Sequence, residues 1–169
     1  VFLSAQGQPF NQQKARELLA KEHFILVCGH YEGIDQRFID ECVDEEISLG
    51  DFVLTGGEIA AMAVTDAVAR MVPGVLADPE CFEDESHYSG LLEYPQYSRP
   101  AVWHGREVPA ILLSGNHKEV AKWRRKQSLR RTRLRRPDMY EKLDLSSKQD
   151  RKLLKEMEQE DLDDGIGED

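Results

Sequence analysis

The stretch ISLGDFVLTGGE, residues 47–58, decides the fold class because it joins a strand pattern to a helix pattern through three glycines. Gly50 interrupts the apolar strand, and the pair Gly56 and Gly57 stands where the helix should begin. Glycine removes side-chain contacts and costs backbone entropy, so another group is expected close to this backbone. The spacing matches neither the dinucleotide fingerprint GxGxxG nor the phosphate loop GxxxxGK[ST].

Strand and helix patterns alternate through the whole first half of the chain. The apolar periodicity predicts strands over 1–5, 24–29 and 44–54, and helices over 11–22, 35–43 and 56–72. Asn11 is suited to cap the first helix, and Pro73 to end the third. Apolar strands that alternate with helices indicate an α/β fold with a parallel sheet covered on both faces.

The second half has a different character, beginning with an acidic stretch that lacks periodicity and predicts a linker. A hairpin with its turn near His104 follows, then helices from about Asn116 through a basic run, over 137–143, and from Ser147. Ser147 and Asp150 resemble a capping box. The predicted organisation is an α/β domain (1–76), an acidic linker (77–92), a small helical domain (93–160) and a disordered acidic tail (161–169).

Composition limits the compartment and the kind of site. The cysteines number three and form no CxxC pair, which favours a reducing, cytoplasmic location. No membrane span or signal peptide is visible, and the histidine spacing matches no structural metal site. Because the chain opens at Val1 directly on a strand pattern, we expect an amino-terminal part of the fold to be missing from it.

Charge is strongly segregated along the chain. The net charge is −10, yet residues 118–136 hold ten Lys or Arg and one acid, which leaves the remainder at about −19. Such a segment predicts a local anion-binding surface on an acidic body. Ten cations with Trp123 among them favour nucleic-acid phosphates as the partner, although a merely solvated helix face is the alternative.

Two more glycine-bearing loops accompany the opening stretch: LSAQG at 3–7 and CGHYEGIDQR at 28–37. Open α/β sheets bind ligands at the carboxyl ends of their strands, so a shared ligand is expected, with three independent tight corners as the alternative. No Lys or Arg lies within 47–58, which makes this site a poor one for a polyphosphate. A neutral or cationic nucleoside-like ligand suits it better.

Five segments in this order, CGHYEGIDQR, ISLGDFVLTGGE, PGVL, SGLLEYPQYSRP and LLSGNHKEVAKWRRKQSLRRTRLRRP, resemble bacterial tRNA (guanine-N1)-methyltransferase of the SPOUT superfamily. The resemblance runs from Val1 to about Pro137. It implies a trefoil-knotted parallel-sheet domain, here partial at its amino terminus, and a small mostly helical domain. It also implies S-adenosylmethionine (AdoMet) as methyl donor, tRNA as substrate, and a homodimer whose active site is shared between subunits.

The resemblance carries cofactor contacts onto thirteen positions of this sequence. They are Leu3, Ser4, Gly29, Tyr31, Glu32, Gly33, Ile47, Ser48, Gly50, Phe52, Leu54, Gly56 and Gly57. These positions lack a basic residue that would confront a sulfonium cation, and their acid favours such a cation.

The reaction implied is methyl transfer to N1 of guanosine 37, which must lose a proton before it becomes a good nucleophile. The family places an aspartate base in the linker; here that position holds Glu85, with Asp84 beside it as the second candidate. Arg70, at the end of the third helix, is expected to stabilise charge on O6. Without the resemblance, the simpler interpretation is that Asp84 and Glu85 belong to a solvated acidic linker and that Arg70 is a cation at a helix terminus.

The resemblance also implies that the basic helix binds tRNA. The expected RNA contacts are Lys122, Arg124, Arg125, Lys126, Arg130, Arg131 and Arg133. Two alternatives stay open, namely another SPOUT RNA methyltransferase and a non-catalytic nucleic-acid-binding module. Mg²⁺ is a candidate ion during turnover, and we expect this chain itself to be inactive or weak because of the segment missing before Val1.

Overall fold

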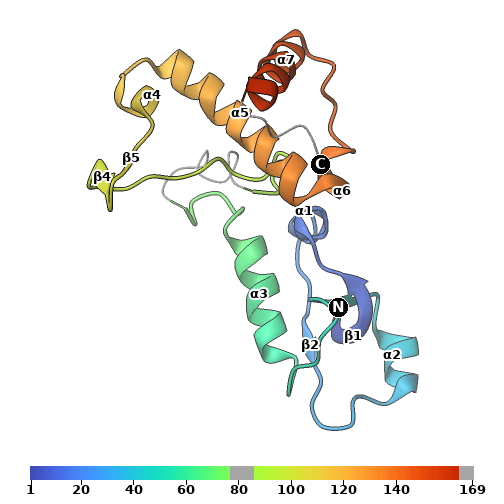
Figure 1. Cartoon of the computed structure of the whole chain (residues 1–169). Helices are drawn as coiled ribbons and strands as arrows, with labels where there is room; N and C mark the ends of the chain where they lie inside the picture. Colours follow the sequence, from blue (N-terminus) through green and yellow to red (C-terminus); the bar gives the residue numbers. More distant parts are fainter. Residues whose placement is uncertain (77–85, 164–169) are drawn as a thin grey trace. The chain divides into compact units, whose positions relative to one another are not determined.

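The computed structural model describes residues 1–76 and 86–163, which belong to two compact units on either side of segment 77–85 (Figure 1). Both predicted bases, Glu85 and Asp84, therefore lie outside the described residues. The end of the predicted tail, 164–169, lies outside them as well.

The first unit is built on a parallel sheet in the order β2-β1-β3, as the alternation of strands and helices predicts. Strand β1 (Phe2–Pro9) is central and pairs with β2 (Val27–Cys28) and β3 (Glu46–Ser48). Within residues 1–76, three helices follow the strands in turn: α1 (Gln12–Leu19), α2 (Gln36–Cys42) and α3 (Glu58–Ala69).

The strand predicted over 44–54 is shorter than expected, since β3 ends at Ser48 and the chain then leaves the sheet. The hydroxyl of Ser48 donates to the carbonyl of Gly50 (3.0 Å) and accepts from its amide (3.1 Å). Gly50 has a φ of +154°, a conformation that disfavours other residues. This local turn, and not sheet pairing, sets the course of the segment that follows.

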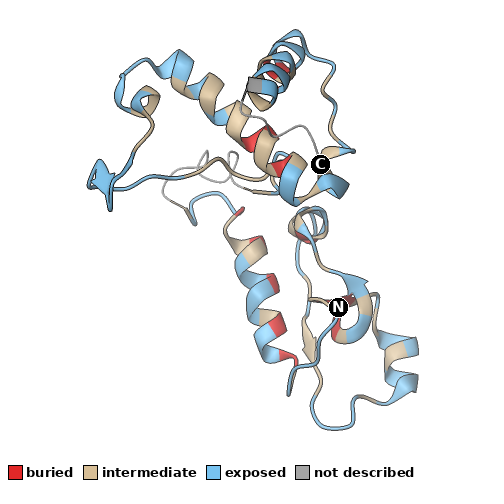
Figure 2. Cartoon of the chain, viewed as in Figure 1, coloured by how far each residue is buried: buried red, intermediate tan, exposed pale blue. Residues whose placement is uncertain are grey.

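Most buried side chains in this unit come from β1, β3, α1 and α3, and Val1 and Met71 lie just outside these elements. Helix α3 buries Ala60, Val64 and Val68 at a spacing of four residues, which forms one stripe along the helix (Figure 2). Helix α1 is capped by Asn11, whose side chain accepts from the amide of Lys14, and it contacts α3. Helix α2 buries no residue. The helical cover on the sheet in the described unit is therefore uneven.

The first regular elements of the second unit form a short antiparallel hairpin, β4 (Val102–Trp103) and β5 (Arg106–Glu107). His104 and Gly105 both have positive φ in its two-residue turn, as a type I′ hairpin requires. Four helices follow in the described part of this unit: α4 (Ala110–Leu113), α5 (His117–Arg135), α6 (Pro137–Tyr140) and α7 (Lys148–Asp163). The predicted hairpin and the three later helices are confirmed; α4 was not anticipated.

The core of the second unit joins residues far apart in sequence: Leu91, Leu129, Leu153 and Met157. The amide of Leu92 donates to the hydroxyl of Thr132 on α5 at 2.9 Å. Residues at the end of the expected linker thus pack within this unit. Likewise, α7 continues to Asp163, so the first residues of the expected tail, 161–163, are helical.

Candidate functional site

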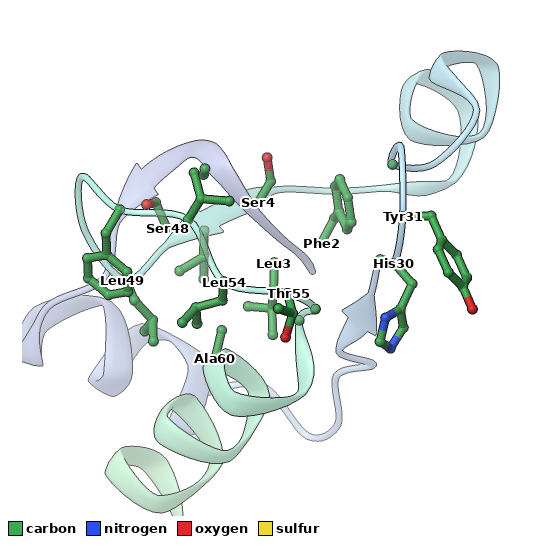
Figure 3. A pocket seen from close by; sticks show the side chains of 18 of the residues that line it. Phe2, Leu3, Ser4, His30, Tyr31, Ser48, Leu49, Leu54, Thr55 and Ala60 are labelled. Carbon is green, nitrogen blue, oxygen red and sulfur yellow. The ribbon is translucent and has the colours of Figure 1, made fainter.

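One cavity of about 280 Å³ lies in the first unit, among the first residues of β1, the loop after β2 and the loop between β3 and α3. All thirteen positions predicted to hold a cofactor line it. Leu3, Leu54 and Ala60 converge on it from β1, this last loop and α3 (Figure 3). The structure therefore gathers into one place residues that are separated by more than fifty positions in the chain.

Sequence reasoning missed seven further lining residues: Phe2, Ala5, His30, Leu49, Val53, Thr55 and Ala60. Of these, His30 has the clearest chemical character, because its Nε2 lies 2.5 Å from Oε1 of Glu58 at the start of α3. The sequence feature that could have pointed to His30 is its position between two glycines of CGHYEGIDQR.

The wall of the cavity needs glycine for a structural reason. A Cβ on Gly57 would lie 2.8 Å from the Cα of Cys28, so the start of α3 touches the end of β2 backbone to backbone. The amide of Gly57 also donates to the carbonyl of Gly29 at 3.2 Å. The group that the sequence predicted close to Gly57 is thus the backbone of strand β2, which forms part of the cavity wall.

The polar lining is acidic on balance. Glu32 lines the cavity, and within 1–76 and 86–163 no lysine or arginine is among the lining residues. Glu58 stands beside them, and hydrogen bonds from its own backbone amide and from His30 lower the pKa of its carboxyl. Both groups favour a neutral or positively charged ligand over a polyphosphate.

Arg70 lies apart from this cavity within one chain. It is the C-cap of α3, whereas the cavity surrounds the start of that helix. A helix of 12 residues is about 18 Å long at a rise of about 1.5 Å per residue. One copy of the chain consequently does not bring Arg70 to the cavity.

Most of the predicted RNA-contacting cations are paired inside the second unit. The pairs are Lys122–Glu156 (2.8 Å), Arg125–Asp150 (3.0 Å), Lys126–Glu160 (2.5 Å), Arg130 with Glu160 (3.0 Å) and Asp161 (3.1 Å), and Arg133–Asp161. All these acids belong to α7. The acidic helix α7 therefore neutralises much of one side of α5.

The other two predicted contacts, Arg124 and Arg131, have different partners. The guanidinium of Arg124 lies over the ring of Tyr94, 4.7 Å from its centroid, and Arg124 remains exposed. Arg131 donates to the carbonyl of Glu93 at 3.3 Å, so it helps to hold the segment that leads into this unit.

Comparison with known proteins identifies the family. The sequence model described as tRNA (Guanine-1)-methyltransferase TrmD matches residues 1–142. The chain belongs to this methyltransferase family. Among its curated relatives, the tRNA (guanine-N(1)-)-methyltransferase of Dehalococcoides mccartyi is 57% identical over 157 residues, which cover 93% of this chain and 63% of the relative.

The methyltransferase of the same name from Clostridium perfringens is 59% identical over 155 residues, 92% of this chain and 65% of that protein. The protein of that name from Ruminiclostridium cellulolyticum is 57% identical over 143 residues, which cover 85% of this chain and 61% of that protein. The chain thus spans somewhat less than two thirds of the length of these relatives. The family membership predicted from the motifs is confirmed.

The described residues offer neither a metal-binding cluster nor a membrane-spanning helix. Within 1–76 and 86–163, no group of three or more His, Cys, Asp or Glu is placed to hold a metal ion. No helix in that part of the chain is long and apolar enough to cross a membrane.

Proposed function

We propose that this member of the tRNA (guanine-1)-methyltransferase family takes part in AdoMet-dependent methylation of guanosine 37 of tRNA at N1, in the cytoplasm. The observation that carries the proposal is the single cavity lined by all thirteen predicted cofactor positions. We include a SPOUT-type trefoil knot in this proposal, with which the parallel order β2-β1-β3 is compatible.

The residues around the cavity fit AdoMet. Phe52 and Leu54 offer apolar surface for an adenine ring, and the carboxylates of Glu32 and Glu58 favour a positive ligand. AdoMet bound there would supply an electrophilic methyl group on its sulfonium. Ser48, Gly50 and their neighbours bring backbone polar groups to the same wall, where a nucleoside can be held without a phosphate.

The proton on guanine N1 requires a base, for which we propose Glu85, with Asp84 as second choice. A carboxylate within hydrogen-bond reach of N1 can accept the proton as the new N–C bond forms. We assign to Arg70 the stabilisation of negative charge that accumulates on O6.

A homodimer with a shared site explains how Arg70 could act although it lies at the far end of α3 from its own cavity. Helix α3 supports this assembly because Ile59 and Met62 on it are exposed, as are Val72 and Val75 just after it. Where exposed apolar side chains form a contiguous patch, they commonly mark a protein–protein contact. A second copy packed there would supply the arginine from its own α3.

The experiment combines calorimetry with analysis of the methylated nucleoside. We expect AdoMet to bind the chain and ATP to bind far more weakly, because no lysine or arginine lines the cavity. Single-turnover reactions, with the chain in excess over a tRNA transcript, should form 1-methylguanosine slowly. The same transcript without guanosine 37 should form none. Failure to bind AdoMet would leave the non-catalytic RNA-binding module as the better account.

A further inference from the structure

A second cavity, of about 390 Å³, lies in the other unit, between the segment 94–101, α4 and the first turns of α5. Two tyrosines, Tyr94 and Tyr97, and two arginines, Arg99 and Arg124, line it together with aliphatic side chains such as Leu112. No carboxylate of residues 86–163 is among those that line it. On a chain with a net charge of −10, this is an unusual concentration of aromatic and cationic groups.

Both tyrosine rings are held in place and yet reachable. The ring of Tyr94 lies beneath the guanidinium of Arg124, and that of Tyr97 packs at 6.4 Å from the ring of Trp123. Tyr97 is 47% exposed, so a ligand can reach it. Fixed aromatic rings and guanidinium planes are the surfaces on which proteins stack unpaired RNA bases.

The charge arrangement in this unit points to the same ligand. Helix α7 already pairs Lys122, Lys126 and Arg130 through its acids. Arg99 and Arg124, in contrast, form no ion pair with any residue of the described ranges. The cations that stay available for phosphate therefore include those at the tyrosine-lined cavity.

We propose that this cavity binds an unpaired nucleobase of the tRNA, with the base stacked on Tyr97 and Arg99 and Arg124 contacting the flanking phosphates. The proposal rests on tRNA being the substrate, and it adds a base-binding site in the second unit, separate from the cofactor cavity of the first. Stacking of this kind tolerates different bases because each has a π face.

The first test measures binding of a fluorescent hexauridylate and of a tRNA transcript to the 169-residue chain. Tyr97→Ala should weaken hexauridylate at least about fivefold. Trp103→Ala is the matched control, because Trp103 is 62% exposed in the same unit and does not line the cavity. Its effect should stay below about twofold. Equal losses in the two variants, or no loss in Tyr97→Ala, would overturn the site.

The second test uses the salt dependence of hexauridylate binding. Each phosphate contact on a single strand contributes about 0.7 to the slope of log affinity against log salt concentration. Arg99→Gln and Arg124→Gln should each lower that slope by about this amount, whereas Lys155→Gln, on the exposed surface of α7, should leave it unchanged. An unchanged slope in both arginine variants would refute the phosphate contacts.

Photo-crosslinking with a hexamer that contains 5-iodouridine locates the base. Attachment to Tyr94 or Tyr97 supports the cavity, and attachment solely to Trp103 or elsewhere contradicts it. Calorimetry with AdoMet on the same preparations separates the two proposals. If the parent chain binds AdoMet and tRNA while Tyr97→Ala binds RNA normally, the base site alone fails. If the parent binds neither ligand, the proposed function fails and this site with it.

Discussion

Replacing Leu54 by arginine tests whether charge selects the ligand that we propose for the cavity of the first unit. Leu54 lines a cavity that has no lysine or arginine, and it is 36% exposed, so a new guanidinium there would be partly solvated. At roughly 7 Å from a sulfonium, the repulsion is about 0.6 kcal/mol in water and about 2.4 kcal/mol at an effective dielectric constant of 20. Partial exposure favours the lower part of this range, about 1 kcal/mol or fivefold in affinity.

The assay is calorimetric titration with AdoMet and with S-adenosylhomocysteine, the product, whose thioether sulfur carries no charge. Both ligands lose the same contact with the leucine, so the difference between their losses isolates the charge. We expect Leu54→Arg to weaken AdoMet about fivefold more than S-adenosylhomocysteine. Leu54→Gln should weaken both equally, since it removes the apolar contact without adding charge.

Ile25→Arg provides the control for added charge on the same unit, because Ile25 is 72% exposed and lies outside the cavity. It should change neither affinity by more than about twofold, since exposed charges farther apart than about 10 Å are screened at ordinary ionic strength. Equal weakening of both ligands by Leu54→Arg would refute the electrostatic reasoning and leave only the shape of the cavity.

Three other substitutions test the remaining parts of the structure. Glu85→Gln should lower the single-turnover methylation rate by about 100-fold or more and leave AdoMet affinity within about twofold; a near-normal rate would transfer the role of base, first to Asp84. Gly57→Val should abolish AdoMet binding and lower the melting temperature, because its Cβ would meet the backbone of Cys28; unchanged calorimetry would contradict that close approach. Burial raises the pKa of Asp150, but hydrogen bonds from Arg125 and Ser147 leave that pKa below its ordinary value of 3.8. The resulting contribution to the free energy of unfolding is present above pH 3.8 and is lost as the pH falls through the lower folded pKa. In urea titrations, Asp150→Asn should therefore lose less free energy of unfolding between about pH 5 and 2 than the parent does. Equal losses would contradict the assignment.

Local sequence patterns determined much of this protein. The caps at Asn11 and Asn116, whose side chains accept from amides three residues later, depend only on near neighbours. The two-residue turn at His104 and the order of strands and helices are equally local. The motifs also identified the family, since their order along the chain is itself specific information.

The expected domain boundaries could not be placed from sequence because burial depends on distant residues. Leu91 follows a polar, acidic stretch, and only Leu129 and Met157 show that it belongs to the core of the second unit. The length of β3 likewise depended on how Ser48 turns the chain at Gly50. The carboxylates near residue 85 and the knot stay predictions.

The sequence by itself determined that ten cations gather within residues 118–136 and that none lies within the glycine-bearing loop 47–58. Only the tertiary structure decided what those charges do. Lys122 meets Glu156, an acid 34 residues further along, whereas Arg124 on the same helix turns to Tyr94. The sequence states where each charged residue stands along the chain. Which residue becomes its partner depends on packing, because electrostatic energy depends on the distance between charges in space.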